Sequence, residues 1–121
     1  MDIAPKPGEL PRHYLQACLL LMMHERPMYG YSVREPLLEL GLGLRDWGQV
    51  YRTLRTMERQ GLILSCWENS ESGPSRRTYY VTEKGREQLR AWAEGMTAAQ
   101  TLVDRFLARY GHGATTRERA V

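Results

Sequence analysis

The feature of this 121-residue chain that most limits its fold is a regular apolar seam near its C-terminus. Seven side chains recur at alternating spacings of three and four residues: Leu89, Trp92, Met96, Ala99, Val103, Phe106 and Tyr110. This heptad-like spacing predicts one helix over residues 82–110, with the seam on one face for about six turns. So small a body cannot cover a seam of that length. We therefore expect a homodimer in which these seven residues form the interface.

A second helix is predicted over residues 48–61 (GQVYRTLRTMERQG), capped by Asp46 and stopped by Gly61. It has one apolar and one basic face. Val50, Leu54 and Met57 recur at helical spacing on the apolar face. The opposite arc holds three arginines and no acidic residue: Gln49, Arg52, Arg55, Thr56 and Arg59. Such a face suits an anionic partner. The net charge of +3 and the pI of about 9.1 also favour an anionic partner.

The residues before this helix predict a flexible arm and two further helices. Residues 1–10 are rich in proline and glycine and are expected to form the arm. Apolar spacing predicts helices over residues 11–25 and 30–40. Pro36 is expected either to bend the second of these or to shift its start.

Beyond residue 61 the pattern changes from helix to strand. Residues 62–68 and 76–81 are rich in residues that favour strands, and residues 69–75 are turn-forming. This predicts a hairpin with a long polar tip. Thr82 is expected to cap the long helix, and residues 111–121 are expected to form a disordered tail.

This order predicts a mostly α-helical fold with a small β-hairpin wing. It is a winged helix-turn-helix DNA-binding domain over residues 11–81 followed by the dimerisation helix. The helix over residues 48–61 is then the recognition helix, which enters the DNA major groove. Two copies would read double-stranded DNA as a two-fold operator, with half-sites spaced by about 10 base pairs or a multiple.

Candidate DNA contacts lie on the recognition helix and the wing. Arginine can clamp guanine and glutamine can clamp adenine through two hydrogen bonds each. Arg76 and Arg77 alternate along a strand and so point to opposite sides, and one of them is expected to face DNA. The predicted DNA-binding residues are Gln49, Tyr51, Arg52, Arg55, Arg59, Ser75, Arg76 and Arg77.

Trp92 has two interpretations. It is either a packing residue of the seam or, with Met96, part of the lining of an inter-subunit cavity for a flat apolar effector.

The sequence has no motif that indicates an enzyme, a metal site or a membrane protein. The three histidines have no metal-ligand spacing, and no phosphate loop or nucleophile motif is present. We therefore expect no enzyme activity, metal or cofactor. No segment is apolar enough for a signal peptide or a membrane span, so we expect a cytoplasmic protein. Cys18 and Cys66 lie in apolar surroundings and are expected to be buried.

Four motifs occur in a fixed order: YGY at 29–31, GQVYRTLRTMERQGLI at 48–63, GPSRRTYYVTEKG at 73–85, then LRAWAE. In this order they resemble the PadR family of bacterial transcriptional regulators, over roughly residues 14–95. The single long last helix resembles the short subgroup of that family. The stretches LGLGLRD and VYRTLRTME resemble the branch of polyhydroxybutyrate-responsive repressors.

The resemblance implies a homodimeric repressor that releases DNA when a small, often aromatic or cationic, molecule binds. By the resemblance, the family's recognition-helix and wing residues correspond to Gly48, Tyr51, Gly73, Pro74, Arg76 and Arg77. Trp92 lies near the place where some short members stack flat drugs. Asp46 and Trp47 depart from the small residue and proline usual in the family.

One alternative stays open. A winged-helix module of this kind could bind another protein and no DNA, with the recognition helix as the partner surface. The basic arc argues against it, since interaction helices usually offer an apolar patch.

Overall fold

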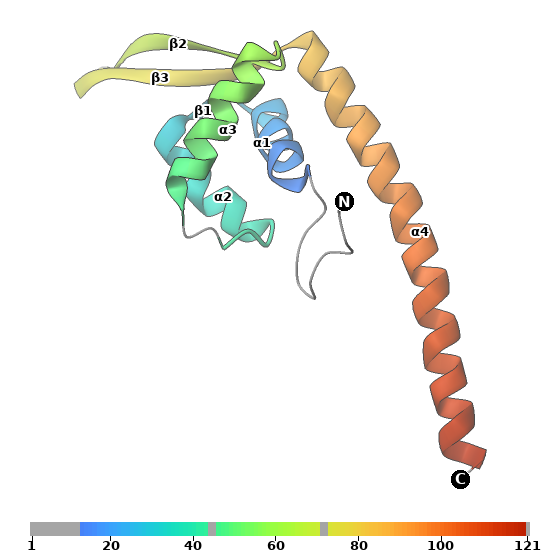
Figure 1. Ribbon diagram of the computed structural model, residues 1–121. Helices are drawn as coiled ribbons and strands as arrows, with labels where there is room; N and C mark the ends of the chain where they lie inside the picture. Colours follow the sequence, from blue (N-terminus) through green and yellow to red (C-terminus); the bar gives the residue numbers. More distant parts are fainter. Residues whose placement is uncertain (1–12, 44–45, 71–72, 121) are drawn as a thin grey trace. The chain divides into compact units, whose positions relative to one another are not determined.

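Figure 1 shows the computed structural model of the protein, which describes residues 13–43, 46–70 and 73–120. The arm predicted over residues 1–10 lies outside the described residues. The chain divides into two compact units, Met1–Leu89 and Arg90–Val121.

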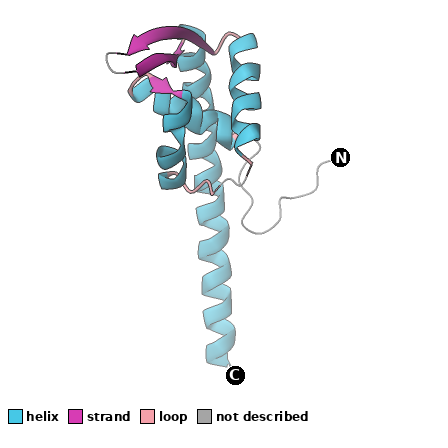
Figure 2. Cartoon of the chain, turned by 90° about the vertical axis from the view of Figure 1, so that its left-hand side faces the viewer, coloured by secondary structure: helices cyan, strands magenta, loops and turns pink. Residues whose placement is uncertain are grey.

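The first unit is a winged helix-turn-helix, so the predicted fold class is confirmed. Its sheet has three antiparallel strands in the order β1-β3-β2, and helices lie below and beside the sheet in the view of Figure 2. The elements in chain order are α1 (Tyr14–Glu25), β1 (Met28–Tyr29), the 3-10 helix η1 (Gly30–Val33), α2 (Arg34–Glu39), α3 (Trp47–Arg59), β2 (Ile63–Ser70), β3 (Gly73–Val81) and α4 (Glu83–Ala120).

The core is built around α1 and the apolar face of α3. Residues on several sides of α1 are buried, including Cys18, as predicted. Val50, Leu54 and Met57 of α3 have no solvent exposure. Because these three side chains hold α3 against the core, its polar arc is left on the surface.

The recognition helix begins and ends where its sequence indicates. The Asp46 carboxylate accepts a hydrogen bond from the Gly48 backbone N–H at 2.9 Å, which caps the first turn. At the other end, Gly61 has a φ of +78°, the left-handed conformation that glycine adopts most readily.

The predicted helix over residues 30–40 is divided in the structure. A 3-10 turn occupies Gly30–Val33, and α2 begins at Arg34. Pro36 is therefore in the first turn of α2, where its missing N–H would have had no helical partner. Of the two expected effects of this proline, the structure shows the shifted start.

The wing differs from its prediction in three respects. Strands β2 and β3 extend to Ser70 and Gly73, which pair with each other, so the long tip expected over residues 69–75 is wrong. The strands remain paired there, with a shift in register between Glu68 and Ser70, and polar residues suit these positions because solvent can reach both faces of a projecting hairpin. The two-residue strand β1 was not predicted. Cys66 is exposed rather than buried, because it lies on the face of the hairpin opposite Ser65.

Helix α4 continues to Ala120, so the predicted end at residue 110 and the disordered tail are wrong for residues 111–120. Gly111 and Gly113 each cost a helix about 1 kcal/mol relative to alanine. The neighbouring alanine, arginine and glutamate residues are good helix formers and offset that cost.

Candidate nucleic-acid interface

The structure places the predicted contact residues of α3 on one exposed face. Gln49, Tyr51, Arg52, Arg55 and Arg59 are all exposed. Burial of the opposite face fixes this orientation, so the helix offers a polar, arginine-rich surface to solvent.

Arg52 forms an ion pair with Asp46, the residue that caps the start of α3. Its guanidinium donates to the Asp46 carboxylate at 3.0 Å, and this bond is the largest cause of the lowered pKa of Asp46. Gly48 makes room for the pair, since a Cβ there would lie 2.9 Å from the Asp46 carboxylate. Both charged side chains are exposed. Such a pair is weak in water, and a phosphate can replace the carboxylate.

The other two arginines of α3 have no carboxylate partner among the residues that the structure describes. Arg59 donates to the Thr56 hydroxyl at 3.3 Å. Arg55 has no ion pair within the same described ranges. It is therefore the guanidinium of this face that is most available to an anion.

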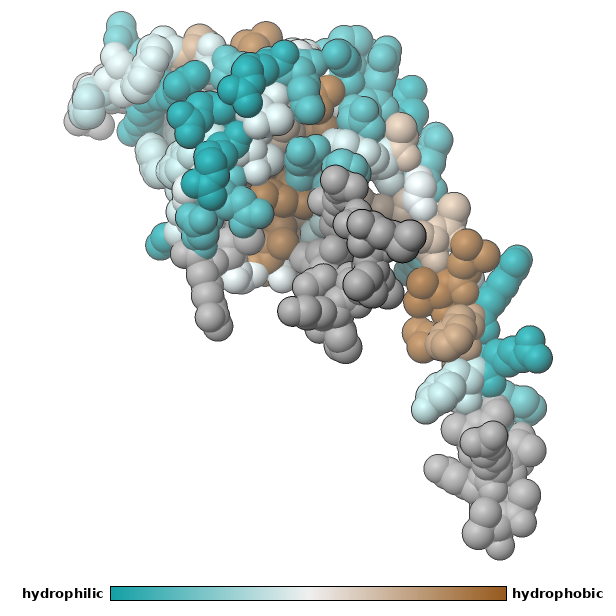
Figure 3. Space-filling view, in the orientation of Figure 1, coloured by the Kyte–Doolittle hydropathy of each residue, from teal (hydrophilic) through white to brown (hydrophobic). Residues whose placement is uncertain are grey.

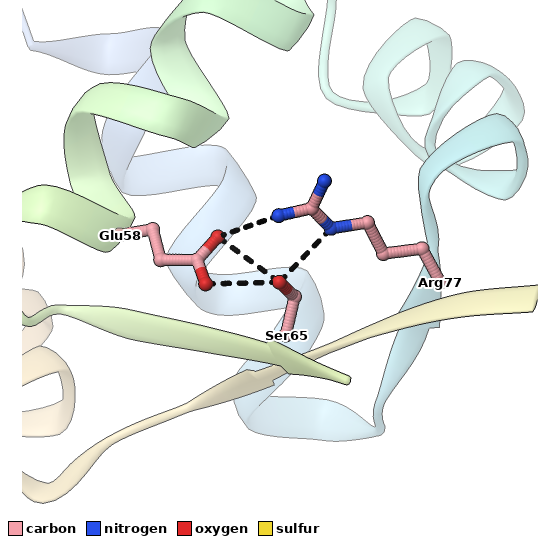
Figure 4. Close-up of polar contacts among 3 residues, drawn as sticks. All are labelled: Glu58, Ser65 and Arg77. Atoms are coloured by element: carbon pink, nitrogen blue, oxygen red, sulfur yellow. Dashed lines mark hydrogen bonds and ion pairs between the residues drawn. The ribbon is translucent and has the colours of Figure 1, made fainter. Parts of the chain in front are cut away.

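Arg77 joins the wing to the recognition helix (Figure 4). The Ser65 hydroxyl donates to the Glu58 carboxylate, with oxygen separations of 2.9 and 3.0 Å. Arg77 Nε donates to Ser65 Oγ at 3.0 Å, and a terminal nitrogen of Arg77 lies 3.4 Å from Glu58. This Glu58–Ser65–Arg77 cluster holds β2 and β3 against α3, and no sequence motif indicates it.

Arg76 points to the other side of the hairpin, as its alternation with Arg77 predicted. Its guanidinium lies 4.9 Å from the centre of the Tyr29 ring. Glu68, its partner in the strand ladder, accepts a hydrogen bond from Tyr80, and that bond raises the pKa of Tyr80 to about 12. The carboxylate of Glu68 is thus engaged on the face away from α3.

Trp47 reinforces the start of the recognition helix. The Arg34 guanidinium of α2 lies 4.6 Å from the centre of its ring. A bulky residue at this position therefore connects α2 to α3.

A groove of about 660 Å³ lies between α3 and the wing. It is lined by Gly30, Tyr31, Tyr51, Trp67, Gly73, Pro74, Ser75, Arg76, Arg77 and Tyr79. The predicted wing residues Ser75, Arg76 and Arg77 are therefore brought together with Tyr51. Trp67 was not predicted, because the sequence does not show which face of the hairpin lies towards α3. Tyr31 was not predicted either, because η1 reaches the groove only through the packing of the folded unit.

A family model decides the relationship of this chain to known proteins. The transcriptional regulator PadR-like family matches residues 19–91. The chain belongs to the PadR family. Members of this family are transcriptional regulators, so the family resemblance of the sequence motifs is confirmed. The resemblances to the short subgroup and to the polyhydroxybutyrate-responsive branch stay predictions.

Solved structures of PadR-family proteins resemble the chain closely. A PadR-like transcriptional regulator from Bacillus cereus is 30% identical with a TM-score of 0.71, covering 77% of this chain and 90% of that one. A PadR-family regulator from Clostridium difficile is 24% identical with a TM-score of 0.71, covering 78% and 98%. Bacillus subtilis PadR in complex with operator DNA shares the fold at 21% identity, with a TM-score of 0.59 and coverage of 69% and 48%. No curated protein sequence matches the chain.

The second unit of this PadR-family chain presents the predicted seam. Trp92 and Met96 are partly buried, whereas Ala99, Val103 and Phe106 are exposed. Phe106 is 68% exposed. Its ring stacks on the Tyr110 ring, with 6.5 Å between the two ring centres. Figure 3 shows apolar side chains gathered along this part of α4.

Two other kinds of site are absent from the described residues. No helix there is both long and apolar enough to cross a membrane. No group of three or more His, Cys, Asp or Glu side chains in the described part of the chain could hold a metal ion.

Proposed function

We propose that this PadR-family protein is a homodimeric transcriptional repressor that binds a two-fold operator and acts in the cytoplasm. The observation that carries the proposal is the exposed basic face of α3 beside the groove and the wing. In this arrangement α3 enters the major groove, and the wing reaches the neighbouring backbone. The operator complex of Bacillus subtilis PadR supports DNA as the partner for this fold.

On α3, the contacts divide into positioning and reading. Gln49 is in the first turn, where a recognition helix meets base edges, and its amide can pair with adenine. Arg55 and Arg59 bind phosphates, which position the helix without reading sequence. Arg52 gives up its ion pair with Asp46 and binds a DNA phosphate in its place.

The apolar seam of α4 supports the homodimer. Large apolar side chains extend beyond the seam itself, since Leu102 and Leu107 are also exposed. A contiguous exposed apolar surface of this kind marks an interaction site. A second copy of α4 offers the complementary surface, and the pair presents two recognition helices.

Operator binding is expected to depend on salt, and this gives the first experiment. Binding of the purified protein to DNA upstream of its own gene would be measured over a range of salt, with unrelated DNA as competitor. A dimer contacting about 8 phosphates should give a log–log slope of about −7. Tight binding that resists the competitor would support a sequence-specific regulator.

Binding that any competitor removes would leave a non-specific DNA binder. No binding even at low salt would contradict the proposal and favour a winged-helix module that binds proteins.

We also propose that the dimer releases DNA when a small apolar or aromatic effector binds beside Trp92 and Met96. Both side chains are partly buried in a single chain, and a second α4 would enclose them. A flat aromatic dye is expected to quench Trp92 fluorescence. Since Trp47 and Trp67 also emit, Trp92→Phe is the control, and undiminished quenching in that variant would discard the effector site.

A further inference from the structure

The groove between α3 and the wing has exposed aromatic rings on three of its sides. Trp67 of β2 is 69% exposed, Tyr31 of η1 is 65% exposed and Tyr51 of α3 is 44% exposed. All three line the groove. A tryptophan left this open to water on the surface beside a recognition helix calls for a partner.

The strand register fixes the direction of Trp67. It lies opposite Arg77 in the β2–β3 ladder, so the two side chains share one face of the hairpin. That face lies towards α3, because Arg77 and Ser65 contact Glu58 of α3. Leu64 is next to Ser65 on the strand and lies on the opposite face.

The walls of the groove are held in place by contacts within the chain. The Glu58–Ser65–Arg77 cluster fixes the wing side to α3. At the floor, Tyr79 is buried, and a Cβ on Gly30 would lie 3.4 Å from the Tyr51 ring and 3.5 Å from the Tyr79 ring. Packing within the chain thus positions the Tyr51 and Tyr79 rings that line the groove.

The proposed function determines what must pass through this groove. When α3 lies in the major groove and the wing lies over the adjacent minor groove, the sugar–phosphate strand between those grooves lies between α3 and the wing. The lining suits such a strand, since it includes Arg77 and Ser75, which lie on the same face of the hairpin as Trp67 and can donate hydrogen bonds to phosphate oxygens.

We propose that the groove holds one sugar–phosphate strand of the duplex and that Trp67 contacts it. The indole N–H donates a hydrogen bond to a phosphate oxygen, and the flat ring packs on the neighbouring deoxyribose. This inference rests on the proposed DNA binding and adds a residue that carries no charge.

A contact of this kind has two measurable properties. It touches the backbone, so it contributes equally to every DNA sequence. It is neutral, so it releases no condensed counterion and leaves the salt dependence of binding unchanged.

The test measures the Kd for a mixed-sequence duplex of about 30 base pairs, about three helical turns, at several salt concentrations. Trp67→Ala is expected to weaken binding about tenfold for each subunit that contacts the duplex, the effect of removing one hydrogen bond to a charged group. The log–log slope should stay that of the wild type. Trp67→Phe keeps a ring without the N–H and should weaken binding less.

Two variants serve as comparisons. Leu64→Ala removes an exposed apolar side chain from the other face of β2 and should bind as the wild type does. Arg55→Ala should reduce the slope by about 0.9 for each phosphate that the arginine neutralises in the wild type. A duplex carrying the operator, once selected, should show the same fold-change for Trp67→Ala as the mixed sequence.

Equal affinity of Trp67→Ala and wild type would overturn the groove contact alone. An equal weakening in Leu64→Ala would also overturn it, because the wing as a whole would then have been disturbed. If the wild type binds no duplex even at low salt, the proposed DNA binding fails, and the groove contact fails with it.

Discussion

Changing Phe106 to aspartate is expected to convert the dimer into monomers and to remove tight operator binding. A symmetric interface repeats every change, so each dimer would bury two unpaired carboxylates. At about 3 kcal/mol or more for each buried unpaired charge, the dimer dissociation constant should rise more than about a thousandfold. A monomer has one recognition helix and cannot engage the second half-site.

Sedimentation of the variant at micromolar concentration measures this outcome. Thr101→Asp is the matched control, because Thr101 lies on the helix face away from the seam and is exposed. It adds the same charge to the same helix and should leave the dimer intact. A dimer that survives Phe106→Asp, or one that both variants disrupt equally, would contradict pairing through this seam.

Sequence reasoning succeeded where structure depends on neighbours along the chain. The cap at Asp46, the end at Gly61 and the spacing of the apolar residues of α3 are local patterns, and all were predicted correctly. The alternation of Arg76 and Arg77 is also local, and the structure places their side chains on opposite faces of the hairpin.

It failed where structure depends on partners distant in sequence. Nothing in the residues of β1 indicates a strand, because two residues show no period, and β1 exists only through its pairing with β3. The roles of Ser65 and Trp67 depend on which face of the hairpin meets α3. That orientation follows from the packing of the whole unit and cannot be read from either strand alone.

The candidate site shows the same division. The basic arc of α3 was predicted from periodicity, but the engagement of Arg52 with Asp46 and of Arg77 with Glu58 was not. A charged side chain on a surface has several possible partners. Which of them it pairs with depends on the distances between the groups in the folded chain. As a result, Arg55 is a better candidate for a phosphate contact than the sequence alone indicated.

Gly85→Ala is expected to destabilise the first unit more than other small substitutions, because Gly85 lies where α4 begins against the α3–β2 connection. A Cβ there would lie 2.1 Å from the Leu62 carbonyl oxygen and 2.8 Å from a Val81 methyl group. The nearest atom is backbone, and it already accepts hydrogen bonds from the Thr82 N–H and hydroxyl, each at 3.0 Å. Relief of the overlap therefore has to break the contacts that hold the start of α4.

We expect Gly85→Ala to lower the free energy of unfolding by about 3 kcal/mol, the upper range for overpacked sites. That change corresponds to a fall in Tm of about 10 °C or more for a domain of this size. Gly95→Ala in the same helix is the matched control, because a Cβ added there would meet nothing within 4 Å apart from its chain neighbours and the nearby backbone of its own helix. Alanine should there stabilise the helix by about 0.5–1 kcal/mol. Two identical substitutions in one helix should thus shift Tm in opposite directions, and a shift of the same sign in both would contradict the close approach at Leu62.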